Sequence, residues 1–394
     1  MQSLKDILND NKTITYGIVQ PGEYDEKGIY MIRSQDYSNG WNDLNSFHKV
    51  SPKVDKPYLR SRVNTGDILI TVVGANVGKL AIVPKVLNES NISRSVARIS
   101  VNNQKCHPKY LFFLLELRVK KLAFLNRVGG AQPVLNLKDL NNFSFNFPSL
   151  PEQQKIASFL SSVDEKISQL EKKKTLLETY KRGIMQKIFS QELRFKDDNG
   201  GDFSNWDRSQ FGEIVERIKK RNNGVSRNVL TISAQYGLIN QEEYFNKSVA
   251  SSNSDNYYLL KKGDFAYNKS YSKGYPLGAI KRLTSYEEGI VSPLYICFRS
   301  RRNIHNDFLS LYFDSQKINA QLYKIVQEGA RNHGLLNMSI DDFFNSIYLV
   351  IPTLQEQQKI ASFLSSIDKK IEITSTQLEK TREFKKGLLQ QMFV

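Results

Sequence analysis

Two long stretches of the chain carry a seven-residue repeat of hydrophobic positions. In the first, apolar side chains recur at Ile156, Val163, Leu170, Leu177 and Ile184, with a second, partly apolar row four positions behind. This spacing is typical of a helix that packs along another helix through one stripe. Prolines precede the stretch, and an acidic residue stands in its first turn, as expected at a helix N-terminus. The pattern predicts a helix over residues 148–190.

The same stretch occurs a second time. The segment EQQKIASFLSS at residues 152–162 recurs letter for letter at residues 356–366, 204 positions later. The register continues without a gap to Phe189 and Phe393. A second helix is therefore predicted over residues 352–394. A period of this length is too long for a solenoid repeat, so it indicates a duplicated unit: a large variable block followed by a long helix.

Each hydrophobic stripe needs an apolar partner. We expect the two helices to pack along each other within one chain, as an antiparallel, coiled-coil-like pair. Two alternatives stay open: each helix packs on its own block, or the helices pair between two chains. The residues expected to pair the helices are Ile156, Leu160, Val163, Ile167, Leu170, Leu177, Ile184, Ile188, Ile360, Leu364, Ile367, Ile371, Leu378, Leu388 and Met392.

The two blocks between the helices have a different pattern. Residues 1–147 and 206–351 are rich in β-branched and aromatic residues, glycine and turn formers, and short apolar runs such as ILITVVG read as buried strands. Other segments read as helices, so each block is predicted to be a mixed α/β (α+β) domain. A turn-rich linker is expected at 191–205. The fold class is two such domains alternating with two long helices, with an internal pseudo-twofold repeat.

Charge changes this picture by indicating a partner. The chain has 56 Lys and Arg against 40 Asp and Glu, a net charge of +16. The surplus is distributed, with +8 on residues 1–147 and +3 on residues 191–351. A spread surplus of this size favours an extended surface for a polyanion, above all nucleic acid.

The residue types that carry catalysis form no recognisable constellation. The loop from Gly74 to Leu80 resembles a phosphate loop, but it has three residues between its glycines and no hydroxyl residue after Lys79. Four histidines are scattered, and the two cysteines have no neighbours at metal-ligand spacing. The N-terminus does not read as a signal peptide, and no apolar run is long enough to span a membrane. We therefore expect a cytoplasmic, non-catalytic binding protein without a metal.

The doubled helix motif resembles one family closely. Residues 148–156 and 352–360, the helix ends at 180–189 and 384–393, and Phe203-Ser-Asn-Trp206 are similar to the DNA-specificity (S) subunit of type I restriction–modification systems. The likeness covers essentially the whole chain. One departure is that the first block has no counterpart of the linker and its Phe-x-x-Trp.

The resemblance implies a non-catalytic part of a DNA adenine methyltransferase and ATP-dependent endonuclease complex. The blocks at 1–147 and 206–351 would be target recognition domains, each reading half of a bipartite double-stranded DNA target in the major groove. The helices would act as a ruler and as docking sites for two modification subunits. S-adenosylmethionine would be bound by the modification subunits, and ATP and magnesium by the restriction subunits. Two other classes stay open: an architectural DNA-binding protein that dimerises through its helices, and a self-contained modifying enzyme.

Residues that read DNA are expected on loops, among side chains that match base edges or phosphates. Lys172, Lys173 and Lys174 are further candidates for contacts with the DNA backbone. The candidates for the two blocks are Arg33, Ser34, Gln35, Asn76, Lys79, Arg94, Gln132, Lys269, Tyr271, Lys273, Arg331, Asn332 and His333.

Overall fold

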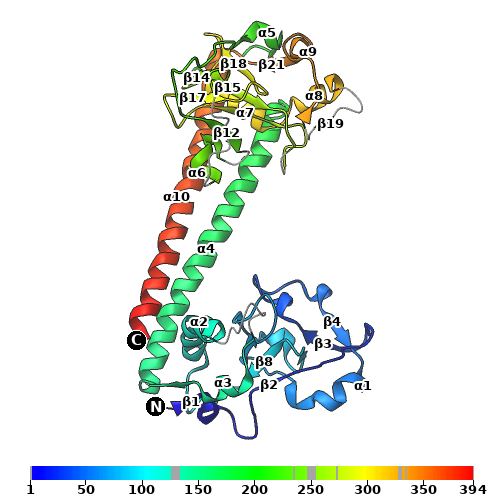
Figure 1. The fold of residues 1–394 in the computed structure, drawn as a ribbon, viewed down its shortest axis with the longest axis vertical. Helices are drawn as coiled ribbons and strands as arrows, with labels where there is room; N and C mark the ends of the chain where they lie inside the picture. The colour runs from blue at the N-terminus through cyan, green and yellow to red at the C-terminus, as the bar shows by residue number, and fades with distance from the viewer. Residues whose placement is uncertain are drawn as a thin grey trace. The chain divides into compact units, whose positions relative to one another are not determined.

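The computed structural model forms two compact units. It describes residues 2–125, 134–233, 236–245, 254–271, 274–326, 331–332 and 335–393. Unit 1 comprises Met1–Lys172 with Ser375–Val394, and unit 2 comprises Lys173–Thr374. Each unit therefore contains one globular block and a part of each long helix, as the colours in Figure 1 show.

The two long helices form as the sequence predicts. Helix α4 runs over Leu150–Phe189 and helix α10 over Leu354–Met392, with lengths of 40 and 39 residues (Figure 1). Pro151 lies in the first turn of α4, where its missing N–H costs no helical hydrogen bond. None of the described helices is long and apolar enough to cross a membrane.

Unit 1 is built on a four-stranded antiparallel sheet in the order β2-β8-β5-β6. A three-stranded sheet, β4-β3-β7, pairs β3 and β7 in parallel, and β1 pairs with β9. The strands are β1 Gln2–Ser3, β2 Thr15–Tyr16, β3 Ile29–Ile32, β4 His48–Val50, β5 Ile68–Thr71, β6 Leu80–Ile82, β7 Asn91–Ile92, β8 Val96–Ile99 and β9 Ser144–Phe145. The helices are η1 Leu4–Ile7, η2 Ser34–Asp36, η3 Leu44–Ser46, α1 Pro52–Asp55, η4 Lys56–Ser61, η5 Lys85–Leu87, α2 Pro108–Leu125 and α3 Leu137–Asn142.

Unit 2 has a corresponding four-stranded antiparallel sheet in the order β11-β18-β15-β16. Strands β12–β13, β14–β17, β10–β21 and β19–β20 form antiparallel pairs. The strands are β10 Asp207–Gln210, β11 Val215–Arg217, β12 Leu230–Ser233, β13 Gly237–Asn240, β14 Tyr258–Lys261, β15 Phe265–Asn268, β16 Ala279–Arg282, β17 Glu288–Val291, β18 Ile296–Ser300, β19 Arg331–Asn332, β20 Leu335–Leu336 and β21 Tyr348–Ile351. The helices are α5 Phe211–Ile214, α6 Gln241–Phe245, α7 Asn306–Asp314, α8 Asn319–Ile325 and α9 Ile340–Asn345.

The predicted repeat is visible in the turns that enter the central strands. Gly66 before β5 has φ +90° and Gly263 before β15 has φ +97°, a left-handed conformation that favours glycine. The following aspartates, Asp67 and Asp264, are buried and accept a hydrogen bond from the backbone N–H three residues upstream. Both central strands are apolar and almost fully buried, as their sequence predicts. Two blocks of different sequence thus share one strand order.

A glutamine joins each long helix to its own block. In unit 1, the buried Gln153 side chain accepts a hydrogen bond from the His107 N–H (2.9 Å) and donates one to the Pro148 carbonyl (2.9 Å). Unit 2 repeats the arrangement with Gln357, the His305 N–H at 2.8 Å and the Pro352 carbonyl at 2.9 Å. Both amide ends are satisfied, so burying the side chain carries no unpaired polar group.

Within unit 1, the two long helices pack side by side. Lys385 of α10 forms ion pairs with Asp164 of α4 (2.8 Å) and Glu116 of α2 (2.9 Å), and Arg382 pairs with Glu171 (2.5 Å). Glu171 follows Asp164 along α4, whereas its partner Arg382 precedes Lys385 along α10, so the two segments run antiparallel. Burial lowers the pKa of Lys385, but the two carboxylates outweigh it and the net shift of that pKa is upward.

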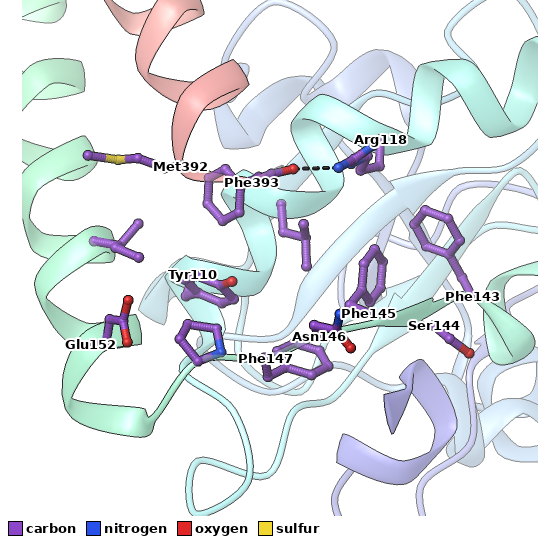
Figure 2. Close-up of a pocket in the computed structure, with 13 residues that line it drawn as sticks. Tyr110, Arg118, Phe143, Ser144, Phe145, Asn146, Phe147, Glu152, Met392 and Phe393 are labelled. Atoms are coloured by element: carbon purple, nitrogen blue, oxygen red, sulfur yellow. Dashed lines mark hydrogen bonds between the residues drawn. The ribbon is translucent and has the colours of Figure 1, made fainter. Parts of the chain in front are cut away.

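Within unit 2, the equivalent contact recurs. Lys181 and Asp368 stand 204 positions from Lys385 and Asp164, and they form an ion pair at 2.6 Å. Ile188 of α4 and Ile360 of α10 belong to the same hydrophobic core. All fifteen residues predicted to pair the helices are buried or half-buried. The sequence pattern does not identify the buried residues Met185, Phe189 and Leu389 of these helices, nor Phe393, which directly follows α10 and lines a pocket of unit 1 (Figure 2).

The segment after α4 packs over the start of α10 in unit 2. Glu356 is fully buried and accepts hydrogen bonds from both the Arg194 guanidinium (2.7 Å) and the indole Nε1–H of Trp206 (3.1 Å). The ring of Phe195 lies 5.5 Å from that of Phe363. Lys359 pairs with Asp198 at 2.6 Å. The turn-rich linker is thus held on the helix by a buried charge and aromatic contacts.

We predict that Glu356→Ala destabilises unit 2. It leaves the guanidinium and the indole without their acceptor, at a cost of about 2–3 kcal/mol, because the Arg194 side chain is 22% exposed and water compensates part of the loss. The midpoint of thermal unfolding should fall by roughly 4–10 °C. The matched control is Glu152→Ala at the repeat-equivalent, exposed position, which should leave the midpoint unchanged. Equal midpoints for both variants would contradict the prediction.

Candidate DNA interface

In unit 1, four loops converge at one end of the central sheet. The Val72 N–H, just after β5, donates to the Ser95 carbonyl at 2.8 Å, and the Leu135 N–H donates to the Val72 carbonyl at 2.9 Å. The hydroxyls of Tyr37 and Thr71 lie 2.8 Å apart. These bonds connect the loops after β3, β5 and β7 with the segment before α3. We call this set of loops the reading end of unit 1.

Most candidate DNA-binding residues of the first block lie at this reading end. Gln35, Lys79 and Arg94 are exposed, and Ser34 and Asn76 are half-buried. Loops anchored on a sheet offer side chains at fixed positions, as a groove-reading surface requires. Proximity brings these residues together but does not test which of them contacts DNA.

The glycine-rich loop connects two antiparallel strands and is not a phosphate cradle. Gly74 and Gly78 have φ of +101° and +83°. The N–H groups of Val77, Gly78 and Lys79 donate to carbonyls of the same hairpin at 2.9–3.2 Å. A phosphate loop needs free amides directed at the anion, and these three are already used. The interpretation of this loop as a strand connection agrees with the structure.

Arg33 is held in a local ion pair. Its guanidinium binds the carboxylate of Asp36 at 3.0 and 3.2 Å and donates to the Ser46 carbonyl at 3.0 Å. Asp36 is 1% exposed, and the guanidinium compensates for the burial of its carboxylate. The structure therefore gives Arg33 a role in holding the loop that presents Ser34 and Gln35.

Unit 2 has an equivalent reading end around the β15–β16 hairpin. The Leu336 N–H donates to the Lys269 carbonyl at 3.0 Å, matching the Leu135–Val72 bond of unit 1. The hairpin loop that begins at Lys269 thus corresponds to the glycine-rich loop, as the sequence comparison of the two halves suggested. Tyr271 is 60% exposed. Burial lowers the pKa of the half-buried Lys269.

The structure describes only some of the remaining candidate DNA-binding residues. Gln132, Lys273 and His333 lie outside the described residues. Arg331 and Asn332 form strand β19, which pairs with β20 beside Lys269. On α4, Lys172 and Lys173 are exposed, and Lys174 approaches Glu178 at 4.0 Å.

The described residues offer no alternative centre of chemistry. No group of three or more His, Cys, Asp or Glu side chains among them has the geometry to hold a metal ion. Both cysteines are buried, and burial raises the pKa of the Cys106 thiol to about 12 and also raises that of Cys297. The search for binding residues missed two structural features. One is the equivalent glutamines of the two units, Gln153 and Gln357, and the other is the contact between Arg194 and Glu356. The one available signal was the letter-for-letter repeat of EQQK.

Comparisons with known proteins point to one family. A family model described as "Type I restriction modification DNA specificity domain" matches the chain twice, over residues 2–179 and 204–381. The chain is 34% identical over 192 residues to the EcoBI specificity subunit of Escherichia coli, covering 48% of this chain and 40% of that protein. It is 27% identical to the MjaVIII specificity subunit of Methanocaldococcus jannaschii, covering 83% and 78%.

Solved structures share the fold. The S subunit of the type I restriction–modification system from M. genitalium matches with a TM-score of 0.55 at 15% identity, covering 100% of this chain and 95% of that one. A chain from a solved structure that describes the complex assembly and conformational transition of a type I R-M system matches with a TM-score of 0.57 at 14% identity. The match covers 100% of this chain and 96% of that one. These matches agree with the mixed domains and the internal repeat.

We predict that two arginines of the reading end of unit 1 behave differently. Arg33→Ala leaves the buried Asp36 carboxylate without its guanidinium, which should cost about 1–2 kcal/mol and lower the thermal midpoint by several degrees. Arg94→Ala removes an exposed side chain and should leave the midpoint unchanged. Differential scanning calorimetry of the two variants and the parent checks this. A midpoint for Arg33→Ala equal to that of Arg94→Ala would contradict the structural role of Arg33.

Proposed function

Because the chain belongs to the type I restriction–modification DNA specificity family, we propose that units 1 and 2 each read one half of a bipartite DNA target in the major groove. The observation that carries the proposal is the pair of reading ends: two hairpin loops at equivalent positions on the same strand order, with different sequences. Equivalent placement suits two equivalent approaches to a duplex, and different side chains suit two different half-sites.

The charge distribution supports this proposal. Both blocks carry a net positive charge, and exposed cationic side chains such as Lys79 and Arg94 lie at the reading end of unit 1. Phosphate contacts from such residues supply affinity without sequence information. The neutral polar residues Ser34, Gln35 and Asn76 beside them have the donor and acceptor groups that read base edges.

The long helices are proposed as a docking site for two modification subunits. Three residues of the repeated stretch, Gln154, Ser158 and Ser162, are exposed, and so are their identical counterparts 204 positions later. Packing in a core does not explain why these exposed positions are identical in the two repeats. Binding of two copies of one partner does explain it. In unit 1, a hollow of about 580 Å³ is lined by Gln154, Ser158 and the start of α2.

Catalysis is assigned to the partners. We infer that the modification subunits bind S-adenosylmethionine and methylate adenine N6, and that restriction subunits use ATP and magnesium for translocation and cleavage. This chain then supplies sequence recognition and spacing. It contributes no catalytic group in the proposal, which agrees with the lack of a catalytic constellation in its sequence.

A methylome tests the proposed function. The chain is co-expressed with the modification subunit encoded beside it in a methylation-free host, and N6-methyladenine is mapped across the genome. The proposal predicts one split motif, two short half-sites around a fixed gap. A soluble, intact complex that leaves the DNA unmethylated, or that methylates without a motif, would contradict it and favour an architectural DNA-binding protein.

The docking proposal predicts a stoichiometry. Ser158→Arg and Ser362→Arg each place a long cation on one copy of the exposed stretch, where it should clash with the partner. Each single variant should bind one modification subunit and the double variant none, as counted by native mass spectrometry. Ser168→Arg on an exposed, non-repeated position of α4 is the matched control and should still bind two. Two bound subunits in the double variant would contradict the site.

The ruler proposal predicts a change in the gap of the target. We infer that α4 and α10 pair as an antiparallel coiled coil whose length sets the distance between the readers. Four extra residues in the middle of both helices add about 6 Å, or one to two base pairs. The methylome should then show unchanged half-sites around a longer gap. The control is replacement of four exposed residues without insertion, and an unchanged gap in the lengthened chain would contradict the ruler.

A further inference from the structure

A tight turn precedes β8 in unit 1 and β18 in unit 2. Residues 93–96 form the first turn and residues 292–295 the second, and in each the N–H of the fourth residue donates to the carbonyl of the first at 3.1 Å. The first turn is part of the loop after β7, at the reading end of unit 1. In unit 2, Ile296 pairs with Tyr267 near the end of β15, so the second turn lies at the same end of the sheet as the β15–β16 hairpin loop.

The strand register shows that the two turns are equivalent. In unit 1, Ile99 of β8 pairs with Ile68, the first residue of β5. In unit 2, Phe298 of β18 pairs with Phe265, the first residue of β15. Each turn ends three residues before the residue that is paired in this way. The two central residues of one turn therefore correspond, in order, to the two central residues of the other.

The central residues of the two turns have opposite chemistry. In unit 1 they are Arg94 and Ser95, a cation and a hydroxyl. In unit 2 they are Pro293 and Leu294, whose side chains have no polar group. Arg94 and Pro293 are exposed, and Leu294 is 57% exposed. The same turn thus presents polar groups at one reading end and an apolar surface at the other.

The backbone of Leu294 is held on both sides. Pro293 has a fixed φ that suits the second position of a turn. The Leu294 N–H donates to the Ser292 hydroxyl at 3.3 Å, and the Tyr295 side chain packs against the hydrophobic core of the block. An exposed apolar side chain on a fixed backbone is prepared for contact with a partner, because little conformational entropy is lost when it binds.

Two neighbouring loops of unit 2 also expose large apolar surfaces. Tyr271 is 60% exposed in the hairpin loop after β15, and Tyr236 is 63% exposed directly before β13. The parallel bridge between Val229 and Ile290 gives β12 and β17 the same direction, so the β12–β13 hairpin ends where the turn at 292–295 begins. A single exposed leucine is common on a protein surface, but three such side chains on adjoining loops indicate a binding surface.

The chemistry of the major groove limits what a leucine can recognise there. The base edges present hydrogen-bond donors and acceptors, together with one apolar group, the 5-methyl group of thymine. The side chain of Leu294 forms no hydrogen bond and has no charge that would attract a phosphate. The thymine methyl group is therefore the feature of a base edge that this side chain fits.

We propose that Leu294 is a specificity-determining residue of unit 2, and that it packs on the 5-methyl group of a thymine in the half-site which this unit reads. The inference rests on the proposed function and deepens it by naming the chemical group that is recognised. Tyr236 and Tyr271 on the adjoining loops keep water away from this contact. The equivalent turn of unit 1 offers the guanidinium of Arg94 and the hydroxyl of Ser95 to its own half-site instead.

Uracil substitution tests the contact, because uracil differs from thymine only by the missing 5-methyl group. Fluorescein-labelled duplexes carry the motif found in the methylome, each with one thymine of either strand replaced by uracil. They are titrated with the complex of the full chain and its modification subunits, and binding is followed by fluorescence anisotropy. We expect at least one thymine in one half-site at which uracil weakens binding about three- to tenfold. Equal affinity for all uracil duplexes and the parent duplex would overturn the proposal.

Matched variants of the chain assign the contact to Leu294. With Leu294→Ala, the preference for thymine over uracil should disappear at that position and remain at any other thymine that shows one. The thermal midpoint should not change, because the side chain is mostly exposed. Leu176→Ala is the matched control, since Leu176 is 59% exposed on α4 and lies outside the reading ends, and it should keep the preference. A preference for thymine that is the same in Leu294→Ala and the parent at every position would overturn the proposal.

The outcomes distinguish this inference from the proposed function. An intact complex that yields no split motif contradicts the proposed function, and this inference with it. A split motif in which no thymine depends on Leu294 overturns the inference alone, and the proposed reading of two half-sites by units 1 and 2 stands.

Discussion

The structure depends on a doubly bonded glutamine at the start of each long helix. Gln153 and Gln357 each join three elements through one amide: the turn before the long helix, the long helix itself, and the residue that precedes helix α2 or α7 of the globular block. The side chain is buried, so the loss of either hydrogen bond would leave an unpaired polar group in an apolar junction. This constraint fixes the direction in which each helix leaves its block, and it explains why this part of the sequence is the same in both repeats.

The repeat separates two kinds of demand on the chain. Gln153 and Gln357, which hold a helix to its block, are identical in the two repeats, and so are exposed residues such as Gln154 and Gln358. The loops of the two reading ends differ in sequence. Ion pairs follow the same rule, since Lys181 with Asp368 and Lys385 with Asp164 are the same contact made twice. The linker is the exception, because it covers Glu356 while Glu152 remains exposed. The start of the long helix is therefore covered by the linker in unit 2, whereas Glu152 is exposed at the equivalent position in unit 1.

The sequence predicted the helices and the repeated mixed domains, because periodicity and letter-for-letter identity are local signals. It predicted less of the reading ends. Arg33 and Arg94 are chemically alike, and only the fold reveals that Arg33 holds the buried Asp36 while Arg94 is exposed. The pocket on Tyr110 and Phe393 depends on rings that lie 283 positions apart and meet only in three dimensions.

The central claim is that the two reading ends meet different half-sites of one target. The chain offers a direct test, because both native cysteines are buried and a surface cysteine would be the one reactive thiol. Asn76→Cys and Tyr271→Cys, each carrying a photo-crosslinker, are assembled on DNA that contains the methylated motif, and the crosslinked bases are mapped. The account predicts that position 76 crosslinks to one half-site and position 271 to the other. Crosslinks from both positions to the same half-site would contradict it.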